Sequence, residues 1–166
     1  MKAEEIKSAD DLAAWLNGLP EDQRMRVSQQ INHRARLGVM PIWLQPNSRS
    51  MPVIGPLIIS TVYLSGQNVN VSSELFDFES KMSKDIANIS AHHAQRFSME
   101  AAKFAALTAA ASSALESSQA AWNAAAAAAA SGAAASDAAK FMSETYQDAI
   151  YLENGVDIQS LPLWRE

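Results

Sequence analysis

The stretch that decides the fold is AWNAAAAAAASGAAA, residues 121–135. It belongs to a longer tract, Ala101 to Ala139, in which 22 of the 39 residues are alanine. Alanine is the strongest helix former, because it loses no side-chain entropy when the backbone is ordered. The tract therefore predicts one helix, or two consecutive helices, near the middle of the molecule.

A few large residues interrupt the alanines at helical spacing. They follow one another at steps of three or four positions, together with smaller residues on the same side of the predicted helix. The members of this series are Phe104, Leu107, Ala111, Leu115, Ser118 and Trp122. We expect this face to point into the core, and Trp122 to be buried there.

Helix breaks are expected along this part of the chain. A continuous helix from Ser73 to Ala130 would be about 87 Å long at about 1.5 Å per residue, too long for a compact domain of 166 residues. The expected break points are Phe97-Ser98, Glu116 to Gln119, and Ser131-Gly132.

The N-terminal part predicts a pair of helices. Ser8 or Asp10 can cap a short helix that ends at Asn17, and Gly18 suits a left-handed position after it. A second helix is expected over 20–37 and should stop at Gly38. Its expected exposed face carries four arginines beside His33, which are Arg24, Arg26, Arg34 and Arg36.

The middle of the chain is less regular. Pro41 and Pro46 disfavour a continuous helix, and Trp43 is expected to close one end of the bundle. Residues 52–65 suit either a strand or a buried helix, and we favour the helix because a lone strand would have no partner. An amphipathic stripe predicts the next helix: Leu75, Phe78, Met82, Ile86, Ile89, His93 and Phe97. A last helix should begin after Ser136-Asp137 and end at Asn154-Gly155.

These elements predict an all-α fold, a compact bundle of about five to seven helices in which the alanine-rich helices pack closely. We interpret residues 1–166 as one domain: a helical pair with a proline-rich connection over 1–50, an alanine-rich core over 51–155, and an irregular tail over 156–166. Ten large residues should be largely buried: Trp15, Trp43, Leu75, Phe78, Ile86, Phe97, Phe104, Leu115, Trp122 and Phe141.

Composition restricts the classes of function. The net charge is −5, and residues 50–166 carry twelve acidic against six basic side chains, which argues against a broad nucleic-acid surface. The absence of cysteine excludes disulfides and thiolate chemistry and fits a reducing cytoplasm. The longest strongly apolar run, Val53 to Leu64, is too short to span a bilayer, so no membrane insertion is expected.

Reactive motifs are not found in the sequence. There is no Gly-x-Ser-x-Gly turn and no glycine-rich phosphate loop, and His92 and His93 are adjacent, so they lack the spacing of metal ligands. Glu74, Asp77 and Glu79 fall in an expected first helical turn, where the helix dipole explains them. We therefore assign no catalytic, cofactor-binding or metal-binding residue.

Three motifs resemble a group of uncharacterised alanine-rich proteins from soil and root-nodule bacteria. They are Asp11-Leu-Ala-Ala-Trp-Leu16; His33-Arg-Ala-Arg-Leu-Gly-Val-Met-Pro41, which is similar to that group's Arg-Ala-Ala-Leu-Arg-Val-Leu-Pro; and the alanine tract with a closing Leu161-Pro-Leu-Trp164. The second motif departs from the group's pattern at Arg36, Gly38 and Met40. The resemblance implies a bacterial origin and a helical fold, for either a short member or an N-terminal module, and it implies no activity.

The arginine-rich helix suggests the function. Its side chains can pair with acidic helices of the same chain, with an acidic partner protein or, least favoured, with nucleic acid. We predict a non-enzymatic protein–protein interaction module, an adaptor, an immunity-type protein or a self-associating protein. The expected partner contacts are Arg24, Arg26, Arg34, Arg36, Trp43 and Trp164. The alternatives are a DNA-binding protein that uses the arginine face of the helix over 20–37, and an enzyme with an unrecognised pocket.

Overall fold

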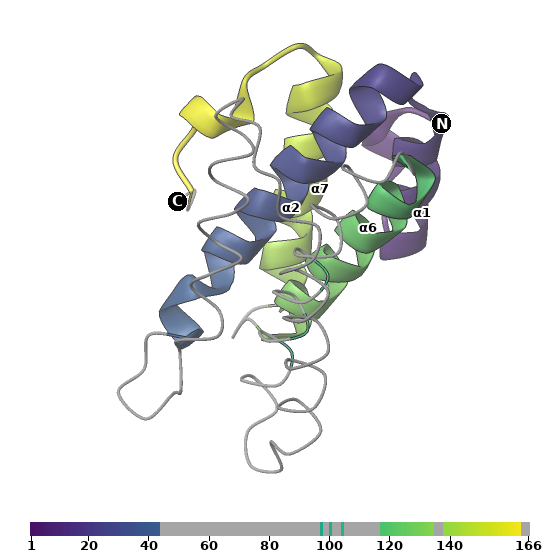
Figure 1. Ribbon diagram of the computed structural model, residues 1–166. Coiled ribbons are helices and arrows are strands. Elements are labelled where there is room, and N and C mark those ends of the chain that lie inside the picture. The colour runs from purple at the N-terminus through teal and green to yellow at the C-terminus, as the bar shows by residue number, and fades with distance from the viewer. Residues whose placement is uncertain (44–96, 98–99, 101–103, 105–116, 135–137, 164–166) are drawn as a thin grey trace, which may run out of the picture.

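The computed structural model describes residues 1–43, 117–134 and 138–163, together with positions 97, 100 and 104. Over these residues the fold is all-helical, with four α-helices, two short 3₁₀-helices and no strand (Figure 1). The elements are η1 (Ala3–Glu5), α1 (Ala9–Gly18), α2 (Glu21–Trp43), α6 (Ser117–Ala134), α7 (Ala138–Glu153) and η2 (Ile158–Ser160). The all-α prediction is confirmed for this part of the chain.

Helices α2 and α6 run in the same direction, and α7 runs against them. Arg24 near the start of α2 contacts Ser118 at the start of α6. Farther along, the backbones of Gly38 in α2 and Gly132 in α6 both approach Phe141, which lies near the start of α7. Helix α1 packs across α6 and η1 packs against α7, so the N-terminal residues cover one end of this group (Figure 1).

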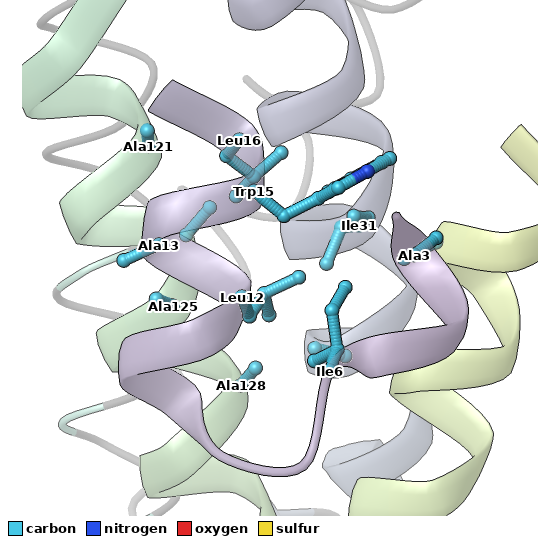
Figure 2. Packing of buried hydrophobic residues seen from close by; sticks show 13 residues of the cluster. Ala3, Ile6, Leu12, Ala13, Trp15, Leu16, Ile31, Ala121, Ala125 and Ala128 are labelled. Atoms are coloured by element: carbon cyan, nitrogen blue, oxygen red, sulfur yellow. The ribbon is translucent and has the colours of Figure 1, made fainter. Parts of the chain in front are cut away.

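The core is made of a few large side chains set among alanines. Leu12, Trp15 and Leu16 from α1 and Ile31 from α2 are buried and meet α6 where its residues are alanine. In Figure 2, Leu12, Ile31 and the N-terminal Ile6 point toward one another beside the α6 alanines. The α6 members of this cluster are Ala121, Ala124, Ala125 and Ala128. Methyl groups let neighbouring helices approach closely, so α6 is the central helix of the described part.

Capping residues and glycine predicted the start of α1 and the end of α7 correctly. Ser8 caps α1, its hydroxyl oxygen accepting a hydrogen bond from the Asp11 N–H at 3.1 Å. Helix α7 ends at Asn154-Gly155, where the N–H of Val156 donates to the Tyr151 carbonyl and the N–H of Gly155 donates to Leu152. Gly155 has a positive φ of 75°, the left-handed conformation that such an end requires.

Three predictions that a glycine ends a helix or follows its end were wrong. Gly18 is the last residue of α1, and α1 ends on the extended residue Leu19. Helix α2 continues through Gly38 to Trp43. Helix α6 continues through Gly132 to Ala134, so no break occurs at Ser131-Gly132. A Cβ at Gly38 would lie 2.8 Å from the Phe141 ring, and one at Gly132 would lie 2.6 Å from the Met142 sulfur. These two glycines therefore serve close helix packing.

The predicted burial is confirmed for Trp15, which is 3% exposed, and is wrong for Trp122, which is 55% exposed. Phe97, Phe104 and Phe141 are partly buried. The side chain of Trp43 and residues Leu75, Phe78, Ile86 and Leu115 lie outside the described part, as do segment 52–65 and the amphipathic stripe apart from Phe97.

Candidate functional site

The arginine face predicted for α2 is not a single face. Successive helical residues are about 100° apart, so positions 24, 26, 34 and 36 spread around the helix. Arg26 is exposed, Arg24 is partly buried, and Arg34 is buried. The expectation of four exposed arginines side by side was therefore wrong.

Arg34 is bound within the chain. Its Nε donates to the Asp148 carboxylate of α7 at 3.0 Å, and the two side chains are 6% and 8% exposed. Its other nitrogens donate to the main-chain carbonyls of Ile158, Leu161 and Pro162. Burial of a charged group requires such pairing, so in this structure Arg34 holds the C-terminal segment of its own chain.

Arg24 of α2 is partly buried, and its guanidinium makes two hydrogen bonds within the chain. Its Nη2 donates to the Leu19 carbonyl at 2.9 Å, and its Nη1 donates to the Ser118 hydroxyl at 3.1 Å. These bonds fix the guanidinium beside the first turn of α6. Of the other expected contacts, Arg36 and Trp43 lie in α2 with side chains outside the described residues, and Trp164 lies outside them altogether.

The largest exposed side chain of the described helices is Trp122, which the sequence pattern had predicted to be buried. It stands on a stripe of α6 that contains Ser118, Trp122, Ala126, Ala129 and Ala133, and all five are exposed or partly exposed. We call these five residues the Trp122 surface. Ser118 precedes Trp122 by one turn, so the Ser118–Arg24 hydrogen bond places a guanidinium one helical turn from Trp122.

The packing of the other α6 residues explains why Trp122 lies on the surface. The other described positions from Ala120 to Ala134 are buried, and α1, α2 and α7 all pack on them. Only small side chains fit between helices at such close approach, apart from Asn123, which accepts a hydrogen bond from Gln119 at 3.0 Å. The alanine run itself was the sequence signal for this arrangement. The faces of α6 that are made of alanine pack against the other helices, and Trp122 lies on the face that is exposed.

A second polar site fixes the N-terminus. The Glu153 carboxylate at the end of α7 accepts hydrogen bonds from the Ala3 N–H and from the Trp15 indole N–H, both at about 3.1–3.2 Å. It therefore joins η1, α1 and α7. Its ligands come from this chain, so we interpret it as structural.

Among the described residues, two ionisable groups have shifted pKa values, and neither is poised for catalysis. Hydrogen bonds from Ser8 and the Lys7 N–H lower the pKa of the Asp11 carboxyl, and the nearby Lys7 charge adds to this. Burial raises the pKa of the Tyr146 hydroxyl above its ordinary value, and the negative charge of Asp11 adds to this. Both groups thus keep their usual ionisation state at neutral pH.

Within the described residues, no group of three or more His, Asp or Glu side chains could hold a metal ion. The helices described here include none with the length and apolar character needed to cross a bilayer. A comparison with protein-family models, curated proteins and solved structures finds no match to this chain.

Proposed function

We propose that this chain is a non-enzymatic protein–protein interaction module and that the Trp122 surface binds the partner. The observation that carries the proposal is the 55% exposure of Trp122 on a helix whose other faces are buried. Tryptophan and arginine dominate binding hot spots, and here Arg24 is fixed one turn away from the indole. Helix α6 itself has no charged residue, so the exposed stripe beside Trp122 is apolar.

The chemistry of this surface defines the partner. A complementary surface needs an apolar pocket for the indole, small residues to lie against Ala126, Ala129 and Ala133, and an acidic group near Arg24. Either another bacterial protein or a second copy of this chain can supply these. We further propose that the protein acts in the cytoplasm and that the whole chain forms a bundle of five to seven helices.

The DNA-binding alternative has lost its main support. A recognition helix must present its basic side chains together toward the major groove. Arg34 is instead bound to Asp148 and to three carbonyls, and positions 24, 26 and 36 spread around α2. The enzyme alternative gains no support either, because the described residues include no group of His, Asp and Glu side chains that could hold a metal ion.

The proposal is tested with the immobilised full-length protein and extracts of its native cells. Trp122→Ser should reduce capture of a specific partner by about 30-fold or more, since loss of a hot-spot tryptophan costs about 2 kcal/mol or more. Trp122→Phe is the matched control, because it keeps an aromatic ring and should retain much of the binding. Arg24→Glu should also weaken capture.

Self-association is distinguished by light scattering on the purified protein. A defined oligomer that Trp122→Ser converts to a monomer of unchanged helicity identifies a second copy as the partner. Capture that is identical for wild type and Trp122→Ser contradicts the proposed surface.

A further inference from the structure

The Arg34 guanidinium recognises peptide backbone. Three of its four described acceptors are main-chain carbonyls, those of Ile158, Leu161 and Pro162, at 2.6, 3.1 and 2.8 Å. The fourth acceptor, the Asp148 carboxylate, neutralises the charge and orients the side chain. A planar guanidinium with five N–H donors suits this recognition, whereas the ammonium of lysine does not.

The bound backbone belongs to the C-terminal segment, residues 157–163. Within the described part of the chain, every hydrogen bond that ties this segment to the helices comes from Arg34. One side chain, Ile158, is fully buried, and η2 packs on α2 and α7. The local turn is held by its own contacts, because Asp157 accepts a hydrogen bond from the Gln159 N–H and Ser160 donates to the Asp157 carbonyl.

A short turn at Gly155 separates the segment from the end of α7. Gly155 adopts its left-handed conformation there, and the next two residues, Val156 and Asp157, are exposed. Within the described residues, the segment is therefore held by the buried Ile158, by the partly buried Leu161 and Leu163, by its own short turn and by the three carbonyls that Arg34 binds. None of them depends on its being covalently attached.

We propose that the surface of α2 and α7 around Arg34 is a peptide-binding site that the C-terminal segment occupies, and that an external peptide of the same chemistry can take its place. The ligand is a short peptide with a branched apolar side chain at the position of Ile158 and a turn that presents carbonyls three and four residues later. Side chains at the positions of Gln159, Ser160 and Pro162 are exposed in the bound segment, so they are free to vary.

The test uses full-length protein and a labelled peptide of residues 156–163, Val-Asp-Ile-Gln-Ser-Leu-Pro-Leu. Ile158→Glu places a charge at a fully buried position, so it should release the segment and leave the site open. Fluorescence anisotropy should show the peptide binding this variant at least ten-fold more tightly than wild type, in which the site is occupied. A peptide with glutamate in place of isoleucine is the control and should not bind.

Arg34 is tested in the same background. Arg34→Lys combined with Ile158→Glu keeps the positive charge beside Asp148 but cannot reach all three carbonyls, so peptide affinity should fall at least ten-fold. Absence of saturable binding to Ile158→Glu at about 1 mM peptide, with helicity unchanged, overturns the proposal. Equal binding to the two variants overturns the role of Arg34.

A second measurement covers the case in which Ile158→Glu does not fold. Hydrogen exchange of the wild-type protein reports the N–H groups of Gln159, Ser160 and Leu161, which are hydrogen-bonded within the segment. Excess unlabelled peptide should accelerate their exchange at least several-fold without changing α1. Exchange that is insensitive to the peptide overturns displacement.

Discussion

Arg34 and Asp148 form a buried ion pair across α2 and α7, with Nε 3.0 Å from the carboxylate oxygen. The positions are 114 residues apart in sequence. The pair is completed by carbonyls of the C-terminal segment, so one guanidinium connects two helices and the end of the described chain.

Removing one partner of this pair should destabilise the fold strongly. Arg34→Ala leaves the Asp148 carboxylate buried without its cation and removes all the bonds to the C-terminal segment, a change that typically costs about 3–5 kcal/mol. The free energy of unfolding is measured by urea denaturation. Arg26→Ala, at an exposed position of the same helix, is the control and should change stability by less than about 0.5 kcal/mol. Equal effects of the two substitutions contradict the described role of Arg34.

The two tryptophans whose side chains the structure describes, Trp15 and Trp122, should respond differently to substitution. Trp15→Ala removes a buried ring and the hydrogen bond to Glu153, so we expect a loss of about 3–5 kcal/mol in stability. Trp122→Ala should change stability by less than about 0.5 kcal/mol, because the ring is largely exposed. Thermal unfolding of both variants checks this. A large loss for Trp122→Ala would show that the ring packs within the fold.

Close packing at Gly38 predicts a steric effect. In Gly38→Ala the new methyl group meets the Phe141 ring at 2.8 Å, and overpacking of this kind costs about 1–3 kcal/mol. The better helix propensity of alanine returns about 0.5–1 kcal/mol. The variant should therefore be net destabilised, and Gly38→Ala in a Phe141→Leu background should be less costly than in wild type. A double-mutant cycle in urea measures the difference; additivity of the two changes contradicts the contact.

The N-cap of α1 predicts a pH dependence. Hydrogen bonds from Ser8 and Lys7 lower the pKa of Asp11, so the folded state favours the ionised carboxylate. The resulting stabilisation is present above the unfolded pKa of about 3.9 and is lost as the pH falls through the lower folded value. Titration of the Asp11 carboxyl carbon by NMR should give a pKa below 3.9, and Ser8→Ala should move it upward. No movement on Ser8→Ala would show that the hydroxyl does not contribute.

Helix ends were predictable where local chemistry decides them. The Ser8 cap, the start of α2 after Pro20 and the glycine end of α7 each depend on a few neighbouring residues, and each is found as expected. Gly38 and Gly132 were mispredicted because their role depends on Phe141 and Met142, which approach from another helix. A single sequence does not show whether glycine ends a helix or admits a neighbour.

The candidate site was predicted least well, for a related reason. The large residues of the alanine tract were expected to face the core, yet α6 is packed by its alanines, and Trp122 lies on the open side. Arg34 was expected at the surface because its partners, Asp148 and the carbonyls of 158–162, are more than a hundred residues away. Of the predicted contact residues, Arg24 enters the proposal through its hydrogen bond to Ser118, and Arg26 is exposed but takes no part in it.

The most direct test of the interaction surface is photo-crosslinking in the native cell. The photoreactive residue p-benzoylphenylalanine is placed at Trp122 and, as the matched control, at Ser143, an exposed position of α7. We expect a discrete adduct, with another protein or with a second copy of this chain, from position 122 and none from position 143. No adduct from position 122, or the same adducts from both positions, would contradict this expectation.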